Sequence, residues 1–124
     1  TITNRFTAQP GTPIPLLLAG FSFGGAIQAY AAQRLKPQKV VLVAPAVQRL
    51  NAPHIIQPGA GHEIEHGPEV LIIQGDRDEV VPLKSVLDWA GPQELPVVVI
   101  SGAEHFFHRR LHILKRTVLD SCRA

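Results

Sequence analysis

The stretch from residue 16 to residue 25 constrains the fold of this chain most strongly. A short apolar run leads into G-F-S-F-G at residues 20–24, and apolar residues at helical spacing follow. This order predicts a strand, a tight turn and a helix, with Ser22 at the apex of the turn. The two glycines of the motif are expected to let the strand and the helix pack closely. Ser22 is therefore a candidate nucleophile, provided that a base and an orienting acid lie near it.

Composition places the chain among ordinary globular proteins. Of its 124 residues, 45% are hydrophobic and 18% charged, and we expect residues 1–124 to form a single domain. The net charge is only +2, and one small basic group near the C-terminus fits a solvated helix face better than a nucleic-acid surface. The single cysteine, Cys122, and the absence of an apolar run long enough for a membrane span predict a cytoplasmic protein without nucleic-acid or membrane partners.

The hydrophobic pattern predicts alternating strands and helices. Short apolar runs bounded by proline or glycine predict buried parallel strands at residues 15–19, 40–44, 70–74 and 97–101. Helical spacing predicts helices from Phe23 to Leu35, from Leu83 to Ala90 and from Phe107 to Cys122. Residues 45–68 are rich in proline and glycine and are expected to form a loop. The chain is thus predicted to be an α/β protein, a three-layer parallel sheet with helices on both faces.

Three polar residues follow three of the predicted strands. Ser22 follows the first strand, Asp78 the third and His105 the fourth. The loops at the carboxyl ends of parallel strands meet at one edge of the sheet, so these side chains are expected to converge there. Serine, histidine and aspartate together can form a nucleophile, a general base and the acid that orients the base.

The segments around these residues resemble three motifs of the α/β-hydrolase superfamily. A-G-F-S-F-G-G at residues 19–25 resembles its nucleophile elbow, G-D-R-D-E-V-V-P at 75–82 its acid loop, and G-A-E-H-F-F at 102–107 its histidine loop. The resemblance covers nearly the whole chain from residue 13 onward. Within the superfamily, the chain is most similar to small, lidless bacterial hydrolases near the dienelactone-hydrolase and carboxylesterase branch, here with serine rather than cysteine as the nucleophile.

The resemblance implies a role for each motif residue. Ser22 would attack an acyl carbon, and His105 would take its proton and later protonate the leaving group. Asp78 would fix the imidazole tautomer, and the backbone N–H of Phe23 would donate to the oxyanion. This implies a serine hydrolase whose partner is a small acyl or ester substrate, with no cofactor and no metal.

Some of these positions have competitors nearby. Asp76 could also accept hydrogen bonds in its loop, but the family places its acid three residues after the glycine, which favours Asp78. His108 and His112 are expected to be surface histidines within the last helix, since the base must come from the loop above the sheet edge.

A different chemistry is suggested by H-E-I-E-H at residues 62–66, which matches the zinc-peptidase pattern H-E-x-x-H. That pattern needs a helix to bring both histidines onto one face. Glycines precede the segment and Gly67-Pro68 ends it, so we interpret it as a polar loop, with His54 nearby adding at most adventitious metal affinity. A metal-dependent peptidase is the third hypothesis, after a non-catalytic binding or scaffold module on a hydrolase fold.

The family also has further strands before the nucleophile strand and a loop that donates a second oxyanion N–H. Residues 1–14 resemble neither, so we expect this chain to be the C-terminal part of a longer protein, without the N-terminal strands. The strand before Ser22 would then lie at the sheet edge, covered by the missing segment or by another copy in a homo-oligomer. Residues 45–69 are too few for both a crossover helix and a lid, which predicts an open site and short acyl substrates.

Overall fold

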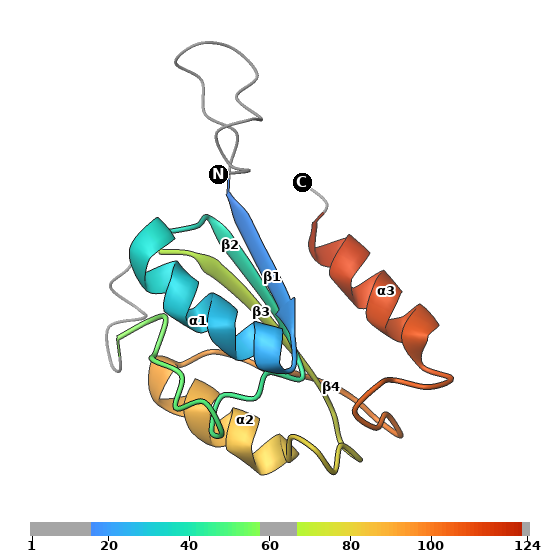
Figure 1. Ribbon diagram of the computed structural model, residues 1–124. Helices are drawn as coiled ribbons and strands as arrows, with labels where there is room; N and C mark the ends of the chain where they lie inside the picture. Colours follow the sequence, from blue (N-terminus) through green and yellow to red (C-terminus); the bar gives the residue numbers. More distant parts are fainter. Residues whose placement is uncertain (1–15, 58–66, 123–124) are drawn as a thin grey trace.

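A computed structural model describes residues 16–57 and 67–122 of the chain (Figure 1). The H-E-I-E-H segment lies outside the described residues. The strands are β1 (Leu17–Phe21), β2 (Lys39–Val43), β3 (Glu69–Gly75) and β4 (Val98–Ile100). The helices are α1 (Phe23–Leu35), α2 (Leu83–Ala90) and α3 (Leu111–Ser121), and a short 3₁₀ helix, η3 (Gly91–Gln93), follows α2.

The four strands form one parallel sheet in the order β1-β2-β3-β4. The register aligns their carboxyl ends: Phe21 at the end of β1 pairs with Val43 at the end of β2, and Val43 pairs in turn with Ile73. The loops that carry the three candidate residues therefore leave the sheet at the same edge. This confirms the predicted α/β fold and its parallel sheet.

Helices cover both faces of the sheet, as predicted (Figure 1). On one face, α1 and α2 pack on β2 and β3 through a core that includes Ala29, Leu42, Ile72 and Trp89. On the other face, Leu114 and Val118 of α3 pack against the second core cluster. Alternate residues of each buried strand serve opposite faces, which explains why these strands are apolar throughout.

The last helix begins later than predicted. Phe107 does not start α3 but lies in the preceding turns, 1% exposed, in the core cluster with Ile73 and Ile100. Phe107 and Arg109 have φ values of 58° and 61°, which are incompatible with a continuous right-handed helix. His108 consequently lies in this turn, and of the two surface histidines only His112 is helical.

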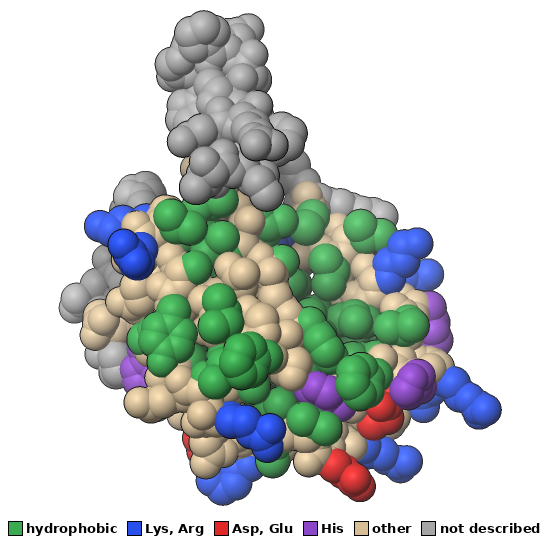
Figure 2. Space-filling model, viewed as in Figure 1, with side chains coloured by type: hydrophobic (Ala, Val, Ile, Leu, Met, Phe, Trp, Pro, Cys, Tyr) green, Lys and Arg blue, Asp and Glu red, His purple; other side chains and the backbone are tan. Residues whose placement is uncertain are grey.

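Within the described part of the chain, β1 is an edge strand, as expected. Leu17 and Phe21 on β1 and Phe23 and Ile27 on α1 are all more than 40% exposed. Figure 2 shows hydrophobic side chains gathered over this side of the molecule. None of the helices that the structure describes has the length and apolar character needed to cross a bilayer.

Candidate active site

Ser22 occupies the predicted tight turn between β1 and α1, with φ 55° and ψ −115°. A non-glycine residue with positive φ is strained and must be held by its surroundings. Here the backbone N–H of Ser22 donates to the carbonyl of Val43 at 2.8 Å, and its carbonyl accepts from the N–H of Ala46 at 2.9 Å. Both bonds tie the turn to the end of β2 and the loop after it.

Glycines permit this turn at Gly20, as expected, and at Gly25 rather than Gly24. A Cβ at Gly20 would lie 2.4 Å from the carbonyl oxygen of Gly24, and one at Gly25 would lie 3.0 Å from the Cβ of Pro45. Apart from its chain neighbours and the nearby backbone of its own helix, a Cβ at Gly24 would meet no atom of the described residues within 4 Å. The expectation that Gly24 makes room for strand and helix is therefore wrong, and the residue after the motif, Gly25, has that role.

Asp78 and His105 form a buried pair. Asp78 is 7% exposed and His105 6%, and Oδ2 of Asp78 lies 2.7 Å from Nδ1 of His105. The other carboxylate oxygen, Oδ1, accepts from the backbone N–H groups of Val80 at 2.8 Å and Val81 at 2.7 Å. An ionised carboxylate only accepts hydrogen bonds, so a bond to one requires the proton of a neutral imidazole to be on Nδ1 and leaves Nε2 unprotonated.

Asp76 has a different environment. It is exposed, and its Oδ1 accepts from the backbone N–H of Gly102 at 2.8 Å. This bond connects the acid loop to the histidine loop but does not reach the imidazole. The geometry thus pairs His105 with Asp78 and gives Asp76 a loop-bridging contact.

Gly75 brings the same two loops into backbone contact. A Cβ at Gly75 would lie 2.3 Å from the carbonyl oxygen of Ala103, a separation that no side chain could occupy. That carbonyl accepts from the N–H of Arg77 at 3.0 Å. The glycine at the start of the acid loop is therefore required by the approach of the loop that carries His105.

Gln74 is a site residue that the sequence analysis missed. It is fully buried near the end of β3, and its Nε2 donates to Oδ2 of Asp78 at 3.1 Å and to the carbonyl of Val81 at 2.8 Å. The reversed amide would point its oxygen at these two acceptors, so the assigned orientation is the favourable one. The signal was present, because Gln74 is the one polar residue between V-L-I-I and the glycine that ends the strand.

His105 lies beside the turn that carries Ser22. Its ring centroid is 5.0 Å from that of Phe21, the residue before Ser22, and 5.0 Å from that of Phe106. Asp78 and His105 are thus in direct contact, and the ring of Phe21, the residue before Ser22, lies against the imidazole. Among the hydrogen bonds of the described residues, none joins the Ser22 hydroxyl to the imidazole.

Glu104 stabilises the turn that follows His105. Its carboxylate accepts from the backbone N–H of His108 at 2.5 Å and of Phe106 at 3.1 Å. The bond from the His108 N–H, followed by that from Phe106, lowers the pKa of Glu104 below its usual 4.5. His108 is exposed, with its own ring beside Glu104, and His112 is also exposed. Neither histidine competes with His105 for Asp78.

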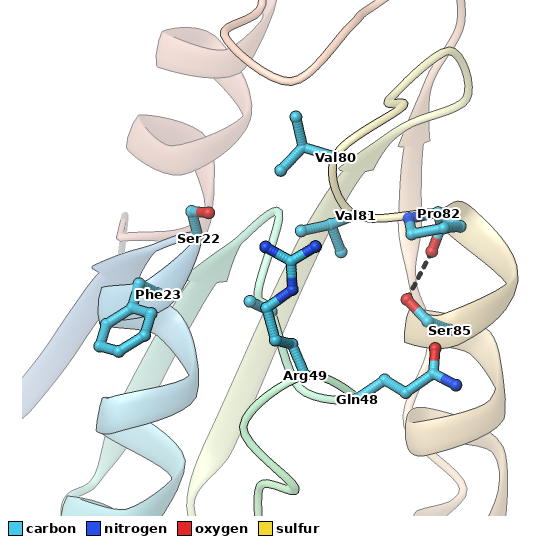
Figure 3. A pocket seen from close by; sticks show the side chains of 9 residues that line it. Ser22, Phe23, Gln48, Arg49, Val80, Val81, Pro82 and Ser85 are labelled. Carbon is cyan, nitrogen blue, oxygen red and sulfur yellow. Dashed lines mark hydrogen bonds between the residues drawn. The ribbon is translucent and has the colours of Figure 1, made fainter.

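Two cavities open at this edge of the sheet. The first, of about 250 Å³, contains Ser22 (Figure 3) and is lined by Ser22, Phe23, Ala46, Gln48, Arg49, Val80, Val81, Pro82 and Ser85. The second, of about 420 Å³, contains His105 and is lined by Arg77, Glu79, Val80, Glu104, His105 and Phe106. Val80 lines both cavities, so they are neighbours.

A metal centre would need several ligating side chains grouped in one place. Within residues 16–57 and 67–122, no three histidine, cysteine or acidic side chains are grouped closely enough to hold a metal ion. His54 lies instead beside Trp89, with ring centroids 6.4 Å apart.

The α/β-hydrolase class of folds has a parallel sheet, with a serine in a strained turn after one strand and an aspartate and a histidine after two others. The described residues have this arrangement. Solved structures agree. The chain is 34% identical to an α/β serine hydrolase homologue from Coxiella burnetii, with a TM-score of 0.76 over 98% of this chain. It is also 34% identical to a lidless α/β serine hydrolase from Xanthomonas campestris, with a TM-score of 0.68 over 91% of this chain.

The chain therefore has the α/β-hydrolase fold, and the resemblance drawn from its three motifs is confirmed. The fold is also shared with Est1E from Butyrivibrio proteoclasticus, at 18% identity and a TM-score of 0.68 over 94% of this chain and 63% of that one. The chain spans 56% of the length of the Coxiella structure and 48% of that from Xanthomonas. No model of a known protein family and no curated protein matches it.

Proposed function

We propose that this chain belongs to a serine hydrolase that cleaves small carboxylic esters or related acyl compounds. The observation that carries the proposal is the buried Asp78–His105 pair, with Oδ2 and Nδ1 2.7 Å apart, beside the strained turn of Ser22. A serine hydroxyl needs a base oriented in this way to become a nucleophile at neutral pH. The solved structures at 34% identity, one described as an α/β serine hydrolase homologue and the other as a lidless α/β serine hydrolase, agree with this chemistry.

In the proposed reaction, Nε2 of His105 takes the proton of Ser22 as Oγ attacks the acyl carbon. Asp78 holds the ring in the required tautomer and stabilises the imidazolium that forms. The imidazolium then protonates the departing alcohol, and a water molecule repeats the sequence to release the acid. Asp78 can orient the imidazole because its other carboxylate oxygen accepts hydrogen bonds from the N–H groups of Val80 and Val81, which hold the carboxylate in place.

The oxyanion of the tetrahedral intermediate needs fixed hydrogen-bond donors. Phe23 is the first residue of α1, so its backbone N–H lacks an acceptor within the helix and lies next to Ser22. Such a donor also benefits from the positive end of the helix dipole. Phe23 thus supplies one oxyanion donor in this proposal, as the resemblance implies.

We expect the enzyme to prefer short acyl chains, of about two to six carbons. A cavity of about 250 Å³ holds roughly eight groups that each occupy about the 30 Å³ of a liquid water molecule. Each methylene beyond that space stays in water and forgoes about 0.8 kcal/mol of burial. The measurement is kcat/KM for p-nitrophenyl esters of graded chain length, with the natural full-length protein and substrates below their micellar concentration.

This series also tests the proposed activity. We expect kcat/KM to fall beyond six carbons, with no activation at a lipid interface and no loss of activity in EDTA. A kcat/KM that keeps rising through twelve carbons would disprove the open, lidless site. Inactivation by EDTA would instead favour the metal-dependent hypothesis.

Gln74 is proposed as a positioning residue that acts through Asp78. Replacement Gln74→Leu removes the donor to Oδ2 of Asp78, and a hydrogen bond to a charged group contributes about 1.5 kcal/mol or more. We expect kcat to fall about tenfold with KM nearly unchanged, because substrate does not touch this buried amide. Steady-state kinetics on a short ester measures both parameters.

Gln93 provides a matched control, because it is also a buried glutamine but lies away from the site. Its side chain accepts from the N–H of Ile55 and Ile56 and donates to the carbonyl of Trp89. Gln93→Leu should lower the melting temperature and leave kcat within about twofold. If both variants change kcat equally, the effect of Gln74 is a general loss of stability and its positioning role is refuted.

A further inference from the structure

Arg49 is the only charged residue among those that line the cavity containing Ser22 in the described part of the chain. Figure 3 shows its guanidinium between Ser22 and Val81, directed into the cavity rather than away from it. The rest of the lining is neutral, and most of it is apolar. A cation on one wall of an otherwise neutral cavity gives the cavity a specific electrostatic preference for an anionic group.

The turn that carries Arg49 is held on both sides. The carbonyl of Val47 accepts from the N–H of Ala52 at 2.8 Å, and Val47 itself is 1% exposed. The hydroxyl of Tyr30 on α1 donates to the carbonyl of Leu50 at 2.8 Å. The backbone of Arg49 is thus anchored to the core and to α1, while its side chain is free to meet a ligand.

Arg49 has no carboxylate partner among the described residues. Other exposed charges do have partners: Lys84, for example, pairs with Asp88 at 2.6 Å. The carboxylate of Asp78 is already bonded to His105, Gln74 and two backbone N–H groups. The guanidinium therefore has its planar set of donors available for a carboxylate, which it can bind through two parallel hydrogen bonds.

The two cavities indicate which part of a substrate Arg49 would meet. In the proposed mechanism His105 protonates the leaving group, so the alcohol lies toward the cavity that contains His105. The acyl chain then occupies the other cavity, in which the guanidinium of Arg49 lies between Ser22 and Val81 (Figure 3).

We propose that Arg49 binds a carboxylate at the far end of the acyl chain, so that the preferred substrates are half-esters of short dicarboxylic acids. This inference rests on the proposed function and narrows its substrate class. The apolar walls contact the methylenes of the acyl chain, and the guanidinium fixes its charged end. Binding at both ends holds the ester carbonyl beside Ser22.

The test compares two esters of the same acyl length in the natural full-length protein. One is the p-nitrophenyl monoester of adipic acid, and the other carries a methyl ester in place of its free carboxylate. We expect kcat/KM to be at least about tenfold higher for the anionic ester, as for a hydrogen bond to a charged group. This preference should weaken at high salt, because Arg49 is exposed.

Variants test whether the preference for the anionic ester depends on the side chain of Arg49. Arg49→Gln should reduce the ratio of the two kcat/KM values to about one, and Arg49→Lys should retain part of it, since lysine keeps the charge but lacks the planar fork. Arg34→Gln is the matched control, because Arg34 is an exposed arginine on α1 outside the cavity. The ratio of the two kcat/KM values in Arg34→Gln should equal the ratio in the unmodified protein.

The outcomes separate this inference from the proposed function. Hydrolysis of both esters with equal kcat/KM, unchanged by Arg49→Gln, refutes the role of Arg49 and leaves the hydrolase activity standing. If neither ester is hydrolysed, the proposed activity fails, and calorimetric titration with monomethyl adipate decides about Arg49. Binding that is lost in Arg49→Gln supports the anion site, whereas no binding, or equal binding by both proteins, overturns it.

Discussion

Replacing Ser22 with alanine should abolish covalent labelling by a fluorophosphonate probe and lower kcat about 10⁴-fold or more. The probe reacts with a serine activated by a neighbouring base and hardly at all with others. Ser22 is held at φ 55° directly after Phe21, whose ring lies against the imidazole of His105, and this imidazole is paired with Asp78. His105→Ala should abolish labelling as well, because it removes the base and leaves the hydroxyl unactivated.

The control for this experiment is Ser101→Ala. Ser101 follows β4 at the same edge of the sheet and is exposed, but it lines neither cavity. Its replacement should leave labelling intact. Labelling that persists in Ser22→Ala would show that another residue reacts, and an intact, folded protein that is never labelled would favour the non-catalytic binding module.

The strand, turn and helix around Ser22 could be predicted because local signals there agree with the global fold. The apolar run, the glycines and the helical spacing each favour the same structure, and α1 begins and ends where expected. The sequence favoured Asp78 over Asp76 as the orienting acid, and of the two only Asp78 bonds to His105.

The spacing of apolar and glycine residues predicted the wrong local structure where contacts between distant segments determine the conformation. Phe107 has the spacing of a helix residue, yet it is drawn into the core beside Ile100 with a positive φ. In the same way, Gly24 belongs to the sequence motif, but the close approach to Pro45 occurs at Gly25. Such steric requirements depend on segments distant in sequence, which periodicity does not reveal.

The side chains around the candidate site were the hardest to predict. Gln74 lies on a strand where its amide faces the acid loop, and Arg49 comes from a turn rich in polar residues. Neither position belongs to a motif, so only the fold shows that one donates to Asp78 and that the other shares a cavity with Ser22. Residues such as Gln74 and Arg49 belong to the candidate site because the fold brings them close to it, and a sequence pattern does not show that proximity.

Asp78→Asn should lower kcat about 10⁴-fold, whereas Asp76→Asn should change it less than about threefold. The asparagine amide at position 78 can present an N–H to Nδ1 of His105, which favours the tautomer with its proton on Nε2 and removes the base that Ser22 needs. At position 76, by contrast, the amide oxygen of asparagine can still accept the bond from the N–H of Gly102, and exposed substitutions of this kind cost little.

Thermal unfolding of both variants, measured beside kcat, distinguishes a chemical effect from a structural one. The amide introduced by Asp78→Asn keeps an oxygen that can accept from the N–H groups of Val80 and Val81, which bond to the carboxylate in the unmodified protein. The new NH₂ group replaces Oδ2 and cannot accept from Nε2 of Gln74, so the melting temperature should fall somewhat while the variant protein remains folded and its activity is lost. Equal losses of kcat in the two variants, with both proteins folded, would contradict the assignment of Asp78 as the orienting acid.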